Sequence, residues 1–254
     1  MNPERLLRQT FRWVGLDVKR ASLPGSSIGL TLNLLDKSQA DITFDVGANE
    51  GQFARELIAF RAKTRIVSFE PVSNARISLL KNARGNPNWT VAERVALGEM
   101  PGEATIYVTQ NSQCSSVRRV AEDVSMLESS FGLRQTEIVP VRRLDDICRQ
   151  FIDAQSKIYL KIDVQGAEKE VFAGSAGVRD QIVGLQIEIS FHDIYTGQSI
   201  GFGLVEEIVD AGFDIYGISN GWRDPKTGKL FQVDVFFIQT ASCGTGPRTK
   251  SISI

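Results

Sequence analysis

Short apolar runs alternate with segments of helical spacing between residues 41 and 240. The runs are rich in Val, Ile and Phe and are bounded by Gly, Pro or charged residues, which is typical of strands. The segments between them repeat apolar residues every three or four positions, which is typical of helices with one buried face. This alternation predicts an α/β protein with a Rossmann-like, doubly wound and mostly parallel sheet.

The elements of this pattern can be bounded from the sequence. Strands are predicted at 42–46, 65–70, within 89–97, at 104–109, at the start of 139–151, and at 158–163, 183–190, 213–218 and 232–239. Helices are predicted at 51–62, 73–83, in the rest of 139–151, and at 167–174 and 203–211. Residues 110–136 are polar and Ser-rich, which indicates a loop or a short helix. No helical segment joins the last two strands, so they are predicted to form an antiparallel hairpin at one edge.

The ends of the chain differ from this pattern. Residues 1–40 are predicted to be a helical extension, because residues 4–20 place apolar side chains at helical spacing among several basic ones. This helix either docks on the main domain or makes peripheral contact with a membrane or the substrate, since basic residues beside aromatic ones suit an interface. Residues 241–254 are rich in Ser, Thr and Gly and are predicted to be a flexible tail. One domain, 41–240, lies between them.

The composition narrows the class of protein. The chain has 254 residues, 42% of them hydrophobic, and a net charge of −1. A nucleic-acid-binding surface is usually clearly basic, so nucleic acid is not expected as a partner. Three cysteines without a C-x-x-C pair indicate a reducing compartment, with neither a disulfide framework nor a structural zinc site. No stretch approaches the roughly 18 apolar residues of a transmembrane segment. The sequence thus predicts a cytoplasmic protein and leaves its oligomeric state open.

The first predicted strand ends in an acidic residue and a glycine turn, D-V-G-A-N-E-G at 45–51. A strand, a glycine turn and a helix N-terminus together form a cradle for a small ligand. A dinucleotide-binding turn would have the pattern G-x-G-x-x-G, but Ala48 and Asn49 stand where the second close glycine is needed. The turn therefore favours a ligand that lacks a diphosphate and carries a charged amino-acid portion and a ribose.

Two carboxylates at strand ends extend this interpretation. Asp45 is placed to meet a cationic amino group, and Glu70 ends the second strand, where an acidic residue can accept hydrogen bonds from both ribose hydroxyls. S-adenosylmethionine (SAM) has an ammonium, a sulfonium, a ribose and no phosphate. The alternatives are a turn residue or helix cap for Asp45 and a solvated strand end for Glu70.

The chain resembles the class I SAM-dependent methyltransferases and, among them, the FkbM family. The resemblance spans roughly residues 40–240 and is carried, in the family's order, by F-D-V-G-A-N-E-G (44–51), F-E-P (69–71), A-L-G (96–98), R-L-D-D-I (143–147), L-K-I-D-V-Q-G-A-E (160–168) and I-E-I-S (187–190). It implies a seven-stranded sheet with an antiparallel edge hairpin and SAM as the cofactor. It also implies O-methylation of a small-molecule hydroxyl, often on a sugar of a glycolipid, polysaccharide or secondary metabolite.

The resemblance further implies a set of cofactor contacts along the carboxyl edge of the sheet. From the amino-acid end through the ribose and adenine to the methyl group, they are Asp45, Gly47, Asn49 and Gly51, then Glu70, then Val95 and Ala96, then Asp163 and Gln165. Family members often carry a polar loop near the site, which corresponds here to Asn111, Ser115 and Ser116.

A hydroxyl acceptor needs a base or a metal ion, because it is a poor nucleophile until it loses its proton. Asp163, Glu188 and His192 are the candidate catalytic residues. His192, the only histidine, titrates near neutral pH and suits a general base, and the alternative is a histidine in a loop. Asp163 and Glu188 could instead bind a divalent cation that orients two sugar hydroxyls. A further alternative for Glu188 is an ion pair with Lys161.

Two other functions remain open. An NAD-dependent oxidoreductase could use a similar sheet, although its glycine turn is missing, and a methyltransferase-like protein could bind the cofactor without turnover. The acceptor, a small molecule or glycan, is not specified by the sequence. Its pocket is expected to be walled by 110–136, 191–202 and 219–230. Aromatic residues there either stack on a sugar or pack within the loops, namely Phe191, Tyr195, Phe202 and Trp222.

Overall fold

The computed structural model describes residues 26–122, 124, 129–224 and 227–240. The helix predicted at 4–20 and the tail predicted at 241–254 lie outside these residues. Within the described ranges, no helix has both the length and the apolar character needed to cross a bilayer.

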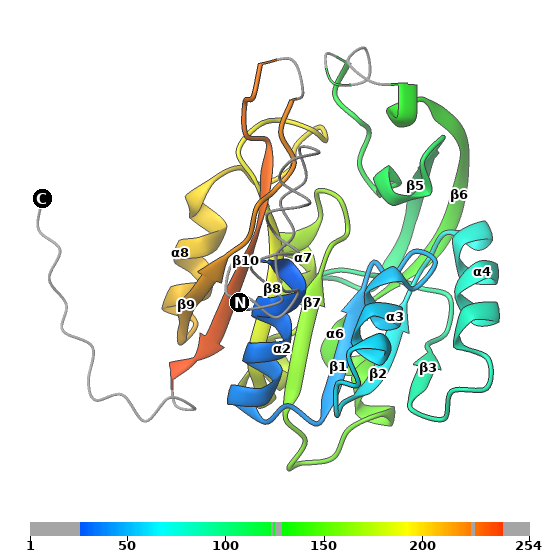
Figure 1. Ribbon diagram of the computed structural model, residues 1–254. Helices are drawn as coiled ribbons and strands as arrows, with labels where there is room; N and C mark the ends of the chain where they lie inside the picture. Colours follow the sequence, from blue (N-terminus) through cyan, green and yellow to red (C-terminus); the bar gives the residue numbers. More distant parts are fainter. Residues whose placement is uncertain (1–25, 123, 125–128, 225–226, 241–254) are drawn as a thin grey trace, which may run out of the picture.

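A seven-stranded sheet runs through the described part of the chain (Figure 1). Its strands are, in spatial order, β3 (Trp89–Val91), β2 (Arg65–Phe69), β1 (Ile42–Val46), β7 (Ile158–Ile162), β8 (Ile182–Ser190), β10 (Gln232–Gln239) and β9 (Phe213–Ile218). β10 is antiparallel to both β8 and β9, whereas the pairs from β3 to β8 are parallel. The predicted doubly wound sheet with an antiparallel hairpin at one edge is confirmed.

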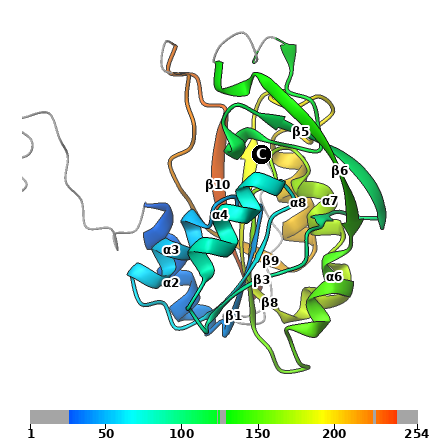
Figure 2. The same ribbon diagram turned by 90° about the vertical axis from the view of Figure 1, so that its right-hand side faces the viewer.

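Helices cover both faces of this sheet, as Figure 2 shows. One layer consists of α2 (Ser27–Ser38), α3 (Gln52–Ala59) and α4 (Ser73–Ala83), and the other of α6 (Leu144–Ile147), α7 (Glu168–Ala173) and α8 (Phe202–Asp210). Each layer has its own apolar core against the sheet, with Leu34 and Leu57 in the first and Val171 and Ile208 in the second. β1 and β7 are consequently buried along their whole length.

Helix α2 belongs to the segment 1–40, which the sequence predicts to be an extension. The helix begins after Ser26, whose side chain accepts a hydrogen bond from the Gly29 N–H and so caps the first turn. Leu34 packs in one cluster with Tyr159 of β7 and Phe236 of β10. The described part of this segment therefore shares the core of the sheet, and the start of the domain at residue 41 stays a prediction.

A second, three-stranded sheet lies beyond the carboxyl ends of β1 and β2 (Figure 1). Its order is β4 (Ala96–Leu97), β6 (Leu133–Arg142) and β5 (Gly102–Thr109). The strand predicted within 89–97 is β3, and the same stretch also holds the start of the second sheet, β4. The loop predicted at 110–136 is wrong from Leu133 onward, because β6 begins there. Exposed polar residues such as Arg134 hide the strand pattern of β6.

Candidate functional site

A cavity of about 430 Å³ opens at the carboxyl edge of the seven-stranded sheet. The turns after β1, β2 and β7 line it, together with the end of β8, the start of α3, the N-terminus of α2 and the second sheet. Ligand sites of doubly wound folds lie at this edge. The two strand-end motifs of the sequence, 45–51 and 160–168, thus meet around one cavity.

Gly47 allows the turns after β1 and β7 to touch. Its backbone φ is 80°, and a Cβ atom built on it would lie 1.7 Å from the carbonyl oxygen of Asp163. A side chain at this position is therefore excluded by backbone contact as well as by conformation.

Gly51 has a different structural role. Its Cβ would meet the ring of Trp89 at 2.5 Å, so this glycine lets α3 start against β3, and it is not among the described residues that line the cavity.

Glu70 joins the first two turns. One carboxylate oxygen accepts the Asn49 N–H and the other the Val72 N–H, both over 2.7 Å. Burial raises the pKa of Glu70 to about 7, although both hydrogen bonds act in the opposite direction. The side chain of Asn49 in turn exchanges hydrogen bonds with the Ser112 hydroxyl, which attaches the loop after β5 to the turn after β1. Glu70 and Asn49 both line the cavity, as does Ser112.

The wall beside Glu70 is apolar. Val95 and Ala96 line the cavity there, next to Leu97, Val72 and Ile106. Val95 and Ala96 are almost fully buried, because Val95 packs in the core of the main sheet and Ala96 packs in a cluster with Ile106 of β5. This wall suits a flat, weakly polar group.

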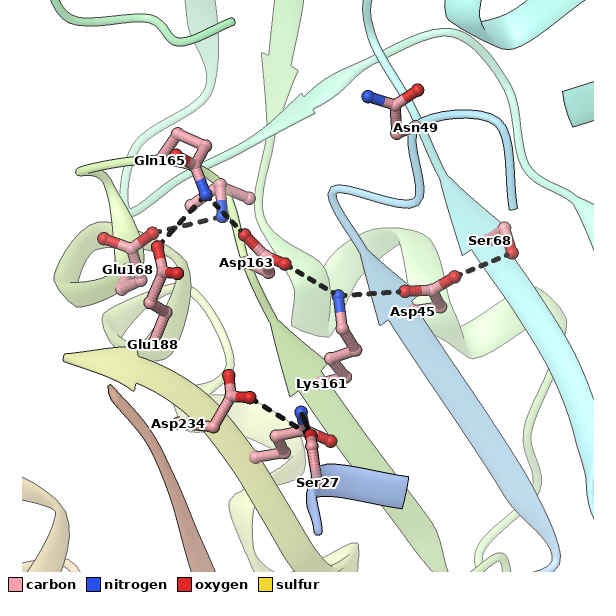
Figure 3. A network of polar contacts seen from close by, with 12 residues as sticks. Ser27, Asp45, Asn49, Ser68, Lys161, Asp163, Gln165, Glu168, Glu188 and Asp234 are labelled. Carbon is pink, nitrogen blue, oxygen red and sulfur yellow. Dashed lines mark hydrogen bonds and ion pairs between the residues drawn. The ribbon is translucent and has the colours of Figure 1, made fainter. Parts of the chain in front are cut away.

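A row of polar side chains crosses the sheet beneath α2 and α3. Ser68 of β2, Asp45 of β1, Lys161 of β7 and Gln186 of β8 occupy matching register positions on four neighbouring strands. Lys161 Nζ lies 3.5 Å from Asp45 Oδ1 and 3.2 Å from Asp163 Oδ2, so it bridges the two carboxylates (Figure 3). Lys161 lines the cavity, whereas the fully buried Asp45 lies behind it and is not among the described lining residues.

The charges in this row are strongly coupled. Burial raises the pKa of Asp45, and attraction by Lys161 opposes this shift without cancelling it. Burial acts to lower the pKa of Lys161, but the neighbouring carboxylates of Asp163 and Asp45 outweigh it, and the pKa is raised. Lys161 is therefore an ammonium ion at every physiological pH.

Gln165 lies at the end of the cavity opposite Glu70 and connects several groups there. Its side-chain nitrogen donates to Asp163 Oδ1 over 2.7 Å and to Glu188 Oε2 over 3.0 Å (Figure 3). Its side-chain oxygen accepts the Tyr195 hydroxyl over 2.7 Å, and its backbone carbonyl accepts the Ser116 hydroxyl. Gln165 thus fixes two carboxylates and two loops at once.

Glu188 is buried at this end and is held by amides. Besides Gln165, the side chain of Gln232 donates to its Oε2 over 2.6 Å. Burial, followed by repulsion from Asp163 and Glu168, raises the pKa of Glu188 well above its ordinary value. The alternative of an ion pair with Lys161 is not formed, because Lys161 pairs with the two aspartates instead.

Two further predictions concern a cation and a histidine. The described residues contain no cluster of three or more His, Cys, Asp or Glu side chains arranged for a metal ion, and the Gln165 amide lies between Asp163 and Glu188. The ring of His192 packs on that of Phe231, with centroids 5.1 Å apart, and His192 is not among the described lining residues. The structure thus brings Asp163 and Glu188 together and leaves His192 apart from them.

The aromatic candidates for sugar stacking are engaged in contacts within the protein. Phe191 lies against Phe202, and Trp222 against Phe231. Tyr195 is fully buried, with its hydroxyl on Gln165. None of the four predicted aromatic residues is among the described lining residues of the cavity.

Several polar lining residues escape a motif search. Asp234 on β10 accepts hydrogen bonds from the hydroxyls of Ser27 and Ser219, and burial raises its pKa. It lines the cavity together with Ser27 and Gln186. Gln186 and Asp234 could have been found from the sequence, because each is a polar residue inside a largely apolar strand.

The sequence matches a family model and a curated relative. Residues 45–215 match the family model described as "Methyltransferase FkbM domain". The chain is also similar to the 2-O-methyltransferase NoeI of Sinorhizobium fredii (strain NBRC 101917 / NGR234), with 25% identity over 173 residues, which cover 66% of this chain and 70% of the relative.

Solved structures with a related arrangement share little sequence with this chain. A putative SAM-dependent methyltransferase from Listeria monocytogenes has 7% identity, a TM-score of 0.47, and coverage of 84% of this chain and 99% of that one. A putative tRNA (m1A22) methyltransferase from Streptococcus pneumoniae, in complex with SAM, has 15% identity, a TM-score of 0.43, and coverage of 88% and 76%.

Proposed function

Because the chain belongs to the FkbM methyltransferase family, we propose that it transfers the methyl group of SAM to a hydroxyl of a small molecule. The acceptor is a sugar hydroxyl of a glycolipid, polysaccharide or secondary metabolite. The observation that carries this proposal is the pair Asp163 and Glu188, joined by one amide at the cavity. The name of the relative NoeI, a 2-O-methyltransferase, supports transfer to oxygen.

The residues along the cavity fit the parts of SAM. Glu70 keeps free lone pairs on both carboxylate oxygens, which can accept the ribose hydroxyls. Val95 and Ala96 supply the apolar wall for the adenine. Gly47 and Asn49 place backbone atoms beside the amino-acid end. Glu70 directly follows β2 and Glu188 is on β8, and these two strands are three strand spacings apart, roughly 14 Å, which separates ribose binding from the acceptor.

When bound, SAM supplies a methyl group that is already activated by the sulfonium, so the protein has to position and deprotonate the acceptor. Glu188 is the base in this proposal, because it is a carboxylate at the cavity and burial raises its pKa, which makes its ionised form a stronger proton acceptor. Gln165 and Gln232 hold its Oε2 in place. Asp163, hydrogen-bonded by Lys161 and Gln165, holds the cofactor beside this base.

The other candidates have less support. His192 would need to move off Phe231 to reach the cavity, and a cation between Asp163 and Glu188 would have to displace the Gln165 amide. Both remain predictions. Substitutions of His192 and of Glu188 test which residue is the base, and an assay with a chelator tests whether a cation is needed.

The charge of the cavity bears on the acceptor. Its described lining includes one basic residue, Lys161, and five acidic ones, which are Glu56, Glu70, Asp163, Glu188 and Asp234. Burial raises the pKa of Glu70, Glu188 and Asp234, but the remaining acidic residues still outnumber the single lysine. This balance favours neutral or cationic acceptors and the cationic cofactor, and it disfavours phosphorylated acceptors and nucleic acid.

The test is an assay with deuterated-methyl SAM and a panel of neutral sugars, amino sugars, sugar phosphates and transfer RNA. We expect a label that survives mild base, as a methyl ether does, on a neutral or amino sugar. Label on RNA, on nitrogen or in a base-labile ester contradicts the proposal. A thermal shift with SAM but no turnover on any sugar favours the cofactor-binding alternative, and a shift with NAD instead favours an oxidoreductase.

A further inference from the structure

Lys161 is the one basic residue among the described residues that line the cavity. It stands in the fourth position of β7, opposite Asp45 in register, and faces the cavity below the turn that carries Gly47. Its side chain is 9% exposed, so it is buried but reachable from the cavity. A buried cation of this kind needs partners on every N–H or a ligand that supplies one.

The hydrogen bonds of Lys161 are incomplete. The ammonium has three donors, and within the described part of the chain one is used on Asp163 Oδ2 over 3.2 Å. Asp45 Oδ1 lies at 3.5 Å and has no hydrogen-bond partner among the described residues, so this contact is an ion pair without a formed hydrogen bond. The ring of Phe53, 5.3 Å from Nζ, closes another side. Donor capacity remains on the side that faces the cavity.

We propose that Lys161 binds the carboxylate of the amino-acid portion of SAM and that Asp45, behind it, is a positioning residue for Lys161. This inference rests on the proposed function, because it assumes SAM as the ligand. Asp163, whose side chain is 34% exposed, lies on the other side of Nζ and accepts the ammonium group of the same amino-acid portion.

The electrostatic balance supports this arrangement. Lys161 alone faces two carboxylates, so a free anion would add to an existing negative excess. The amino-acid portion of SAM is a zwitterion and adds no net charge. Its carboxylate takes the vacant donor of Lys161 while its ammonium compensates Asp163, and both new contacts are charge-assisted hydrogen bonds in a buried site.

The test compares SAM with decarboxylated SAM, which keeps the sulfonium and the ammonium and lacks only the carboxylate. We would measure both dissociation constants by calorimetry for the wild-type protein and for the double variant Lys161→Met, Asp45→Asn. This double variant removes one positive and one negative charge, so the net charge of the cavity is unchanged. Lys169→Met is the matched control, because Lys169 is an exposed lysine on α7 that pairs with Glu207.

We expect the wild-type protein to prefer SAM, and the double variant to reduce this preference on the order of tenfold to a hundredfold, the worth of a charge-assisted hydrogen bond. The control should keep the wild-type preference. Equal weakening of both ligands in the double variant, or a preference that survives it, overturns the assignment of Lys161. Failure of the wild-type protein to bind either ligand overturns the proposed function itself.

A second pair of measurements covers the case in which the double variant does not fold. Lys161→Gln with Asp45→Asn keeps a neutral donor of similar length and should lose most of the preference for SAM. Absence of any preference in the wild-type protein, which needs no variant, is also sufficient to reject the proposal.

Discussion

The side-chain amide of Gln165 donates a hydrogen bond to Oε2 of Glu188 over 3.0 Å. The same nitrogen donates to Asp163 Oδ1, and the backbone of Gln165 adopts a left-handed φ of 60°, which few non-glycine residues do. An amide that donates its two N–H groups to two carboxylates fixes the distance between them and requires both carboxylates to be hydrogen-bond acceptors. A residue without acid–base chemistry therefore organises the acceptor end of the cavity.

Gln165→Glu removes both donors and places a third carboxyl group between Asp163 and Glu188. Like charges at this separation favour the protonated forms, so the base should be harder to ionise. We expect kcat at pH 7 to fall at least about a hundredfold and the acid limb of the kcat–pH profile to move to higher pH. Gln135→Glu on the exposed surface of β6 is the matched control. A fall in kcat without a shifted pH profile would mean that Gln165 has only a structural role.

Glu188→Gln tests the proposed base directly. The amide keeps the shape of the side chain but cannot take a proton, so we expect kcat to fall about 10²- to 10⁴-fold, with SAM affinity changed less than about threefold. His192→Ala tests the competing base. Because His192 packs on Phe231, we expect this change to lower stability by about 1 kcal/mol and kcat by less than about tenfold. The reverse ranking of the two kcat values would identify His192 as the base.

How far the fold follows from the sequence depends on burial. β1, α4 and β10 have the predicted bounds, because their apolar pattern is set by a core that covers them. The first half of β6 was not predicted, because Arg134, Gln135 and Thr136 there are polar and exposed, and because the strand pairs with β5 rather than with the main sheet. Strand pairing of this kind depends on contacts between distant segments, which a local pattern does not contain.

The site residues, too, were predicted where a local motif indicates them and missed where distant segments meet. Strand-end motifs predict Gly47, Glu70 and Asp163, which line the cavity, because a glycine turn after a buried strand has a fixed place in a doubly wound sheet. The placement of Asp45 behind Lys161 follows from the register of β1 and β7, two strands far apart in the sequence. The packing of His192 on Phe231 depends on β10 joining β8, and no feature around the histidine indicates it.

Gly47→Ala should destabilise the protein far more than the same change elsewhere. The new Cβ would meet the Asp163 carbonyl oxygen at 1.7 Å, so the turns after β1 and β7 must separate. Gly85→Ala is the control, because Gly85 has a φ of 85° and a Cβ atom added there would meet no other atom within 4 Å. We expect Gly85→Ala to lower the free energy of unfolding by about 1 kcal/mol, from the unfavourable backbone conformation alone, and Gly47→Ala to lower it by more than about 3 kcal/mol. Both values are measured by urea unfolding. Equal losses would mean that the backbone contact is unimportant.

Stability should fall as the pH rises from about 5 to 8. The pKa values of Glu70 and Glu168 are both raised by burial to about 7 in the folded protein, from an ordinary value of 4.5. The folded state therefore binds these protons more tightly than the unfolded state, so the stabilisation is complete below pH 4.5 and is lost as the pH passes 7. Urea titrations across this range should show the decline, and Glu70→Gln should make it shallower. The exposed Glu103→Gln on β5 should leave the slope unchanged.

Binding of SAM should release a proton near pH 7. Glu70 is partly protonated there, and acceptance of the ribose hydroxyls beside a cationic ligand favours its ionised form. Affinity should therefore rise with pH between about 6 and 8, by at most about tenfold per pH unit for this one group. Calorimetry at pH 7 in two buffers of different ionisation enthalpy should reveal the released proton as a difference in binding heat. Glu70→Gln should weaken binding and abolish that difference, whereas a heat independent of the buffer in the wild-type protein would rule out the titration of Glu70 on binding.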